Sequence, residues 1–163
     1  MGPATRDTAP LVYSVKMGYH VNTVIRSDAS WSELSKVAGL SWVVTTQERK
    51  TVGQRGTNYT SSALVAEGMT LREAVTACRS LGIKEVRFES DSAQLIQAVN
   101  SKQPTLEIYG IVEDILRLSG DFEVVDFIWI PRLRNAEADM YAKQALSLFV
   151  REVGEAVFMP PPN

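Results

Sequence analysis

The chain has 163 residues, of which 45% are hydrophobic and 22% charged, and its formal net charge is −2. This size and composition predict one domain with its own core. No membrane-spanning helix is expected, because no apolar run reaches the roughly 18 to 20 residues that span a bilayer. The N-terminus lacks the pattern of a secretory signal, so we expect an intracellular protein of the nucleus or cytoplasm, with an organelle as the alternative.

The chain contains a single cysteine and a single histidine. An internal disulfide is therefore impossible, and neither a pair of catalytic histidines nor a metal site built from several histidines is expected. Any metal would be held mainly by carboxylates, which favour hard cations such as Mg²⁺ or Mn²⁺.

The chain divides into three predicted segments. Residues 1–19 carry two prolines and no clear period, which predicts an irregular N-terminal lead-in. Residues 20–150 show alternating strand and helix patterns and form the predicted domain. Residues 151–163 end in the sequence FMPPPN, which cannot continue a helix, so we expect a C-terminal tail.

Three strand-like segments begin the predicted domain. They cover residues 20–30, 36–47 and 51–60, contain many β-branched residues, and include a predicted hairpin turn between the second and third. A long helix is expected over residues 61–81, with Gly82 ending it.

Strands and helices alternate in the rest of the domain. A strand is expected at 84–90, two helices at 91–100 and 105–120, a fifth strand at 122–131, and a last helix at 135–149. Three successive strands predict an antiparallel meander, and strands separated by helices predict parallel additions. The chain is thus expected to be an α/β protein with a mixed five-stranded sheet flanked by helices.

Four carboxylates occupy positions where solvated charge is not expected. Glu67 lies in the apolar half of the predicted long helix, and Asp139 lies on a core-facing stripe of the last helix. Asp28 lies on the first strand, and Asp91 lies where the fourth strand becomes a helix. Because α/β folds build sites at the ends of central parallel strands, these acids could converge on one edge of the sheet.

Convergence of four carboxylates requires cations, since the acids otherwise repel one another. Four such ligands can hold two Mg²⁺ ions roughly 4 Å apart, an arrangement that promotes attack of water on phosphorus. Each acid also has a simpler interpretation when taken alone. Asp91 could be the N-cap of the capping box DSAQ, Asp28 a turn residue, and Glu67 and Asp139 partners of basic side chains.

Four segments of the chain resemble the ribonuclease H family, and most closely the reverse-transcriptase-like RNase H domains that are abundant in plant genomes. They are SDASW (27–31), AEGMTLREAV (66–75), ESDSAQLI (89–96) and IPRLRNAEADMYAKQAL (130–146). They follow the family's order and span about residues 20–150. The resemblance implies the RNase H-like fold, with the sheet in the order 3-2-1-4-5.

The same resemblance implies a catalytic site and a substrate. The family's metal-binding, catalytic acids correspond to Asp28, Glu67, Asp91 and Asp139. The expected reaction is Mg²⁺-dependent cleavage of the RNA strand of an RNA–DNA hybrid, with two ions bound in the presence of substrate and Mn²⁺ able to replace them. We expect the isolated domain to be a monomer.

Substrate contacts are expected around this site, partly with the 2′-hydroxyls that distinguish RNA from DNA. The residues assigned to such contacts are Ala29, Ser30, Ser62, Ser92, Arg132, Arg134 and Asn135. The two arginines fit phosphate contacts and solvated surface equally well, and the asparagine is expected first as the cap of the last helix. Other basic candidates for phosphate contact include Lys50, Arg55 and Lys143.

Two departures from the family leave other functions open. Ala93 stands where many members carry a polar residue, and only SKQP separates the two middle helices, where some bacterial forms carry a basic protrusion. One alternative is a non-catalytic or weakly active nucleic-acid-binding or scaffolding module derived from a retroelement RNase H domain. Another is a related nuclease acting on single-stranded ends or DNA duplexes. Net charge excludes none of these, since setting aside four of the 19 acidic residues leaves 15 against 17 basic ones.

Overall fold

The computed structural model describes residues 21–158, with side chains up to residue 153. The predicted lead-in, residues 1–19, lies outside the described residues. In chain order the elements are β1 (Val24–Ser32), β2 (Val37–Thr45), β3 (Lys50–Thr57), α2 (Ala63–Ser80), β4 (Glu85–Ser90), α3 (Ala93–Ser101), η2 (Leu106–Ile108), α4 (Tyr109–Ser119), β5 (Val124–Trp129), η3 (Arg132–Asn135) and α5 (Ala136–Phe158). No helix among the described residues has the length and apolar character needed to cross a membrane.

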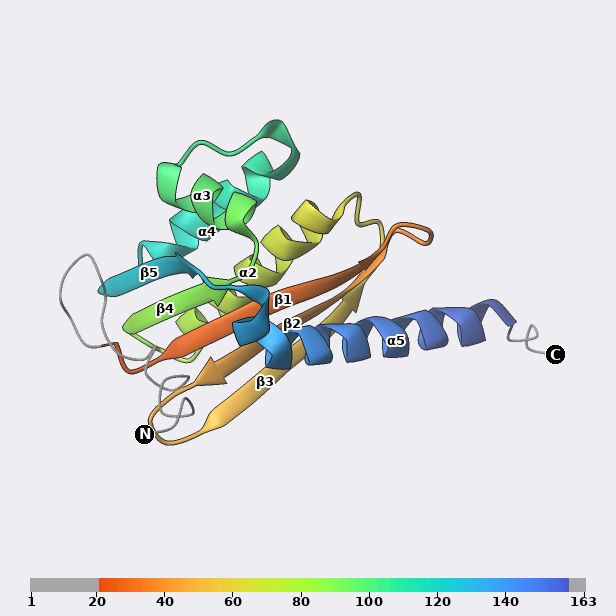
Figure 1. Cartoon of the computed structure of the whole chain (residues 1–163), viewed down its shortest axis with the longest axis horizontal. Helices are drawn as coiled ribbons and strands as arrows, with labels where there is room; N and C mark the ends of the chain where they lie inside the picture. The colour runs from red at the N-terminus through yellow and green to blue at the C-terminus, as the bar shows by residue number, and fades with distance from the viewer. Residues whose placement is uncertain (1–20, 159–163) are drawn as a thin grey trace.

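The strands form one sheet in the order β3-β2-β1-β4-β5, which confirms the predicted order (Figure 1). β1, β2 and β3 are antiparallel neighbours, whereas β4 and β5 add in parallel on the other side of β1. The last pair of the β1–β4 ladder is Ser27 with Ser90. Asp28 and Asp91 each follow that pair by one residue, so the register brings Asp28 of β1 beside Asp91, which lies in the turn after β4.

The main core lies between the sheet and the helices α2, α3 and α4. Ile25 of β1 and Phe88 of β4 are fully buried there, together with Leu71 of α2. The rings of Phe88 and Phe127 stack with their centroids 5.3 Å apart. This packing fixes α2 against the central strands, as burial of apolar area is the main favourable term in folding.

The helix α5 crosses the opposite face of β1, β2 and β3 (Figure 1). Gly39 of β2 permits this close approach, because a Cβ atom there would lie 2.1 Å from the carbonyl oxygen of Ala142. The Ser41 hydroxyl donates a hydrogen bond to the carbonyl of Ala138 at 2.5 Å. Since Ser41 pairs with Asp28 in the sheet, this bond sets the first turns of α5 beside the central strand.

The same helix is longer than the sequence pattern predicts. It continues to Phe158 rather than ending near Phe149, and its last turns extend past the sheet (Figure 1). The segment after Phe149 contains no proline before Pro160, so no proline ends the helix earlier. The expected tail, residues 151–163, is therefore helical as far as Phe158, while residues 159–163 lie outside the described residues.

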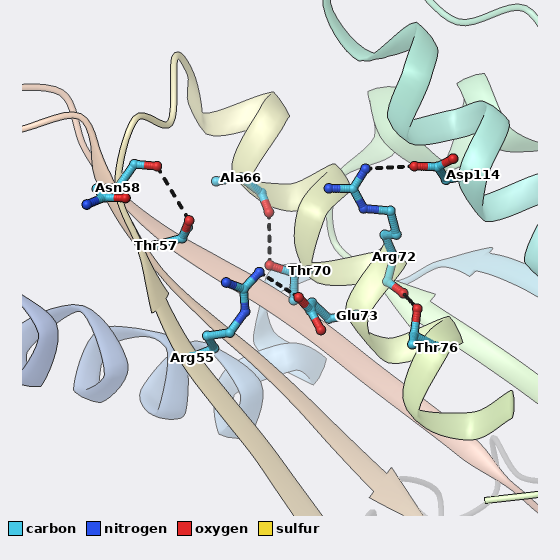
Figure 2. A network of polar contacts seen from close by, with 9 residues as sticks. All are labelled: Arg55, Thr57, Asn58, Ala66, Thr70, Arg72, Glu73, Thr76 and Asp114. Carbon is cyan, nitrogen blue, oxygen red and sulfur yellow. Dashed lines mark hydrogen bonds and ion pairs between the residues drawn. The ribbon is translucent and has the colours of Figure 1, made fainter. Parts of the chain in front are cut away.

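Polar contacts hold the outer side of α2 on two flanks (Figure 2). Glu73 pairs with Arg55 of β3 at 2.5 Å, and Arg72 pairs with Asp114 of α4 at 2.9 Å. Each such surface pair contributes only about 0–1 kcal/mol. The buried face of α2, with Leu71, Ala74 and Val75 in the main core, sets the orientation of the helix, and these pairs add to it on the outer side.

Candidate metal centre

Three of the four predicted acids meet at one point. Asp28 comes from β1, Glu67 from α2, and Asp91 from the turn after β4. Each offers one carboxylate oxygen, and these oxygens all lie within 4.8 Å of one another. Residues from three separate elements therefore converge where the strand register brings β1 and β4 side by side.

Burial and mutual repulsion raise the pKa values of two of these acids, Asp28 and Glu67. Burial is the main reason that the pKa of Asp28 rises from 3.8 to about 7, and the negative charge of Asp91 and contacts with Asp139 add to the rise. Burial likewise raises the pKa of Glu67, with the charges of Asp28 and Asp91 as the next causes. A negatively charged group can stay ionised in such surroundings when a cation compensates it.

The donor atoms fit a hard divalent cation. Oε2 of Glu67 is buried and has no hydrogen-bond partner among the described residues, so a strong acceptor is left unsatisfied inside the cluster. Carboxylate oxygens are the ligands that Mg²⁺ and Mn²⁺ prefer. The three acids are thus a possible metal-binding triad.

Asp139 lies beside this triad but not within it. Its carboxylate hydrogen-bonds Asp28 and contributes to the raised pKa of that residue. One turn further along α5, Nζ of Lys143 lies 2.9 Å from Oδ2 of Asp139. The fourth predicted acid is therefore near the cluster and forms a solvent-exposed ion pair with a lysine of its own helix.

Asn135 connects three parts of the site. Its side-chain NH₂ group donates to the carbonyl of Ser27 at 2.9 Å and to Oδ2 of Asp91 at 3.3 Å. Asn135 is fully buried at the end of η3, and its Oδ1 has no hydrogen-bond partner among the described residues. It therefore does not cap α5, and the capping prediction for this residue is wrong. The side chain turns inward and orients Asp91 instead.

Two predicted substrate residues serve as helix caps. Ser92 is the N-cap of α3, where its hydroxyl accepts from the backbone N–H of Leu95 at 3.4 Å. The interpretation of Asp91 as that cap is therefore wrong, and its carboxylate stays in the cluster. Ser62 caps α2 by accepting from the N–H of Val65 at 3.1 Å, and it also hydrogen-bonds Glu107.

The other predicted contact residues differ in their surroundings. Ser30 and Ala29 are half-buried on β1, and the backbone N–H of Ala29 hydrogen-bonds Glu67, which offsets a small part of the rise in the pKa of that acid. Arg132 and Arg134 are exposed on η3. Lys50 pairs with an acid of α5 and Arg55 with one of α2, so these two basic candidates are already engaged.

One residue of the site was not predicted from the sequence. Trp129 ends β5, and its indole N–H donates to the backbone carbonyl of Asp91 at 3.1 Å. The residue is 50% exposed. A tryptophan suggests core packing when only composition is considered, but its place at the end of a strand parallel to β4 is a signal that it lies near Asp91.

Comparisons with known proteins agree with this architecture. A family model described as reverse transcriptase-like matches residues 26–145. No curated protein sequence matches the chain significantly. Among solved structures, the N-terminal RNase H domain of Rv2228c from Mycobacterium tuberculosis is 21% identical with a TM-score of 0.73, and the alignment covers 80% of this chain and 97% of that one.

Two further structures extend the comparison. LC11-RNase H1, isolated from compost, is 20% identical with a TM-score of 0.72, and the alignment covers 79% of this chain and 98% of that one. The same enzyme has been solved in complex with an RNA/DNA hybrid. RNase H1 from Halobacterium salinarum is 19% identical with a TM-score of 0.67, covering 76% of this chain and 96% of that one. At these identities the similarity establishes a shared fold.

Proposed function

Because the chain belongs to the reverse transcriptase-like family and has the RNase H fold, we propose that it is a metal-dependent endoribonuclease that cleaves the RNA strand of RNA–DNA hybrids. The observation that carries the proposal is the triad of Asp28, Glu67 and Asp91, with its buried and unsatisfied Glu67 oxygen. The complex of LC11-RNase H1 with a hybrid supports the choice of substrate.

The acids would hold divalent cations, Mg²⁺ being the cation we propose and Mn²⁺ a substitute. Asp28, Glu67 and Asp91 would supply the first set of ligands, and Asp139 would join Asp28 in holding a second ion. When bound, such ions supply a water molecule activated for in-line attack and stabilise charge on the leaving oxygen. The products would be RNA ends with a 5′-phosphate and a 3′-hydroxyl.

The chain's own residues orient these acids and receive the substrate. The side-chain NH₂ of Asn135 donates a hydrogen bond to the carboxylate of Asp91, and the backbone N–H of Ala29 donates one to the carboxylate of Glu67. Ser30 lies on the same strand as Asp28, so it is the serine we assign to a 2′-hydroxyl of the RNA. The exposed Arg132 and Arg134 would meet the phosphates on the side of Asp91.

A cleavage assay tests the proposal directly. The protein is incubated with Mg²⁺ and an end-labelled hybrid, double-stranded RNA or double-stranded DNA of the same sequence. We expect cleavage of the RNA in the hybrid alone and its loss in EDTA. Cleavage of the DNA duplex instead would favour a related nuclease of different substrate class.

Two variants identify the site in this assay. Asp91→Asn should reduce cleavage by at least about 100-fold with the circular dichroism spectrum unchanged, because a ligand is lost while the side-chain shape is kept. Asp121→Asn is the matched control, since Asp121 is exposed and pairs with Arg79 instead of contacting the triad. Equal activity of Asp91→Asn and wild type would refute the site.

One observation favours a second candidate function. Asp139 lies outside the triad and pairs with Lys143, which suits a module that binds hybrids without cleaving them efficiently. Absence of cleavage at micromolar protein, with hybrid binding retained in a filter-binding assay, would decide for this alternative.

A further inference from the structure

Trp129 lies beside the triad on the edge strand of the sheet. In the parallel β4–β5 register it pairs with Ser90, the residue before Asp91. Its indole N–H reaches across to the Asp91 carbonyl at 3.1 Å, while half of the residue remains exposed. The indole therefore touches the main chain of a candidate metal ligand on one side and solvent on the other.

The main chain at Asp91 needs such a contact. The β1–β4 ladder ends at Ser90, and the backbone N–H of Ile130 donates a hydrogen bond to the Ser90 carbonyl at 2.9 Å. The next carbonyl, that of Asp91, accepts a hydrogen bond from the indole N–H of Trp129. Asn135 fixes the carboxylate of Asp91 and Trp129 fixes its peptide group, so two residues outside the triad determine where this acid points.

The segment that follows Trp129 carries exposed side chains that suit a nucleic-acid strand. The chain continues from Trp129 into η3, which exposes Arg132, Leu133 and Arg134. Leu133 is 92% exposed. Aromatic faces combined with arginines bind nucleic acid by stacking and charge, without reading sequence.

We propose that Trp129 is a positioning residue for Asp91 whose exposed indole face packs against the bound nucleic-acid strand. The inference rests on the proposed function. A strand covering the indole would exclude water that competes for its N–H, so substrate binding would strengthen the hydrogen bond to Asp91. Trp129 thereby links occupation of the substrate surface to the orientation of a metal ligand.

Two substitutions separate the two roles of the indole. Trp129→Phe keeps an aromatic face but removes the N–H. We expect it to raise the Mg²⁺ concentration at the midpoint of thermal stabilisation and to lower kcat, each by roughly 3- to 10-fold, with KM for the hybrid little changed. Trp129→Ala also removes the face, and we expect hybrid affinity to fall by roughly 10-fold in addition.

Trp31 provides a matched control. Its indole N–H donates to the carbonyl of Thr60 at 2.9 Å, so Trp31→Phe removes a hydrogen bond of the same type. We expect Trp31→Phe to lower Tm about as much as Trp129→Phe does, without moving the Mg²⁺ midpoint. A merely structural role for Trp129 would make the two variants behave alike.

A spectroscopic readout follows the hydrogen bond itself. The indole ¹⁵N–¹H resonance of Trp129 is assigned by its absence from the Trp129→Phe spectrum. We expect this resonance to shift on Mg²⁺ titration of the wild type and to stay in place in Asp91→Asn.

The possible results separate this inference from the proposed function. A wild type that binds Mg²⁺ and cleaves the hybrid, with a Trp129→Phe variant identical to it, would overturn the positioning role alone. An unchanged hybrid affinity in Trp129→Ala would overturn the contact with the strand. A wild type with no response to Mg²⁺ and no cleavage would overturn both proposals.

Discussion

Asp28 illustrates how single residues create the site. It is 4% exposed and lies next to two further triad acids and Asp139. Helical periodicity suffices to turn Glu67 and Asp139 inward, because the apolar stripes of both helices are clear in the sequence. The pairing of Asp139 with Lys143 is harder to predict, although a spacing of four residues permits it, because the lysine lies among the outward-facing residues of that helix.

The raised pKa of Asp28 predicts how stability depends on pH without metal. The folded protein keeps a proton on Asp28 up to about pH 7, whereas in the unfolded chain the acid ionises near its ordinary value of 3.8. Stability from this residue should therefore fall as the pH rises through this interval. We expect Asp28→Asn to abolish this loss and to be more stable than wild type by roughly 1–3 kcal/mol at pH 7 in EDTA.

Urea denaturation of both proteins in EDTA, at pH values between about 4 and 7.5, measures this difference. Addition of Mg²⁺ is the control, because it should restore the wild type and leave Asp28→Asn unchanged. A stability difference that does not vary with pH would contradict the expectation.

The Lys143–Asp139 pair predicts a change in metal affinity. Replacing Lys143 with Met removes a positive charge next to the acids and frees Asp139. We expect the Mg²⁺ concentration at half-maximal thermal stabilisation to fall by about 2- to 5-fold. An effect of this size is typical of removing one charge that lies close to a metal site and is partly exposed to solvent. Lys50→Met is the matched control, because Lys50 pairs with Glu137 of the same helix at 3.0 Å but does not contact the four acids. Equal midpoints for the two variants would argue against this role of Lys143.

At the scale of elements, some features follow from sequence patterns and others depend on close packing. The meander of the first three strands and the parallel addition of the later two are predictable from the order of the elements, whereas the strand order itself is implied by the resemblance to the RNase H family. The N-cap residue of α3 could not be predicted in this way, because Asp91 and Ser92 are both good N-cap residues and only the backbone geometry selects Ser92. The inward turn of Asn135 depends on contacts with Ser27 and Asp91, which are distant in sequence.

Gly39 tests whether the close approach of α5 to β2 is required. Gly39→Ala places a methyl group 2.1 Å from the Ala142 carbonyl and 2.2 Å from the backbone N of Leu146, so strand and helix must separate. We expect a loss of at least about 2 kcal/mol in the free energy of unfolding, measured by urea denaturation. Gly110→Ala is the matched control, because a Cβ there has no neighbour within 4 Å. In α4 that change should stabilise by about 0.5–1 kcal/mol.

A tolerated Gly39→Ala would mean that α5 sits further from the sheet. Because Ser41 and Ala138 link this helix to the strand that pairs with β1, Asp139 would then lie further from Asp28 as well. Activity of the variant therefore reports on the same packing as its stability.

For the molecule as a whole, one sheet carries two helical layers that meet the site from opposite faces. Glu67 comes from α2 in the layer with the main core, and Asp139 comes from α5 on the other face. Asp28 of β1 and Asp91, just after β4, lie between them, so the site depends on both layers being docked. The part of α5 that extends past the sheet contributes neither to the site nor to the docking of this helix.

The extension of α5 beyond the sheet therefore predicts where the domain ends. Phe149 packs on Gly56 of β3, where its ring fills the space that a Cβ atom of residue 56 would need. After it, Val150 and Val153 are 47% and 42% exposed.

A chain ending at residue 150 should keep its Tm within about 2 °C and retain hybrid cleavage, because little apolar area is uncovered. Phe149→Ala in the full chain should instead cost roughly 2–4 kcal/mol in the free energy of unfolding. Calorimetry of both proteins compares the two effects, and a truncated chain less stable than Phe149→Ala would place the domain boundary beyond residue 150.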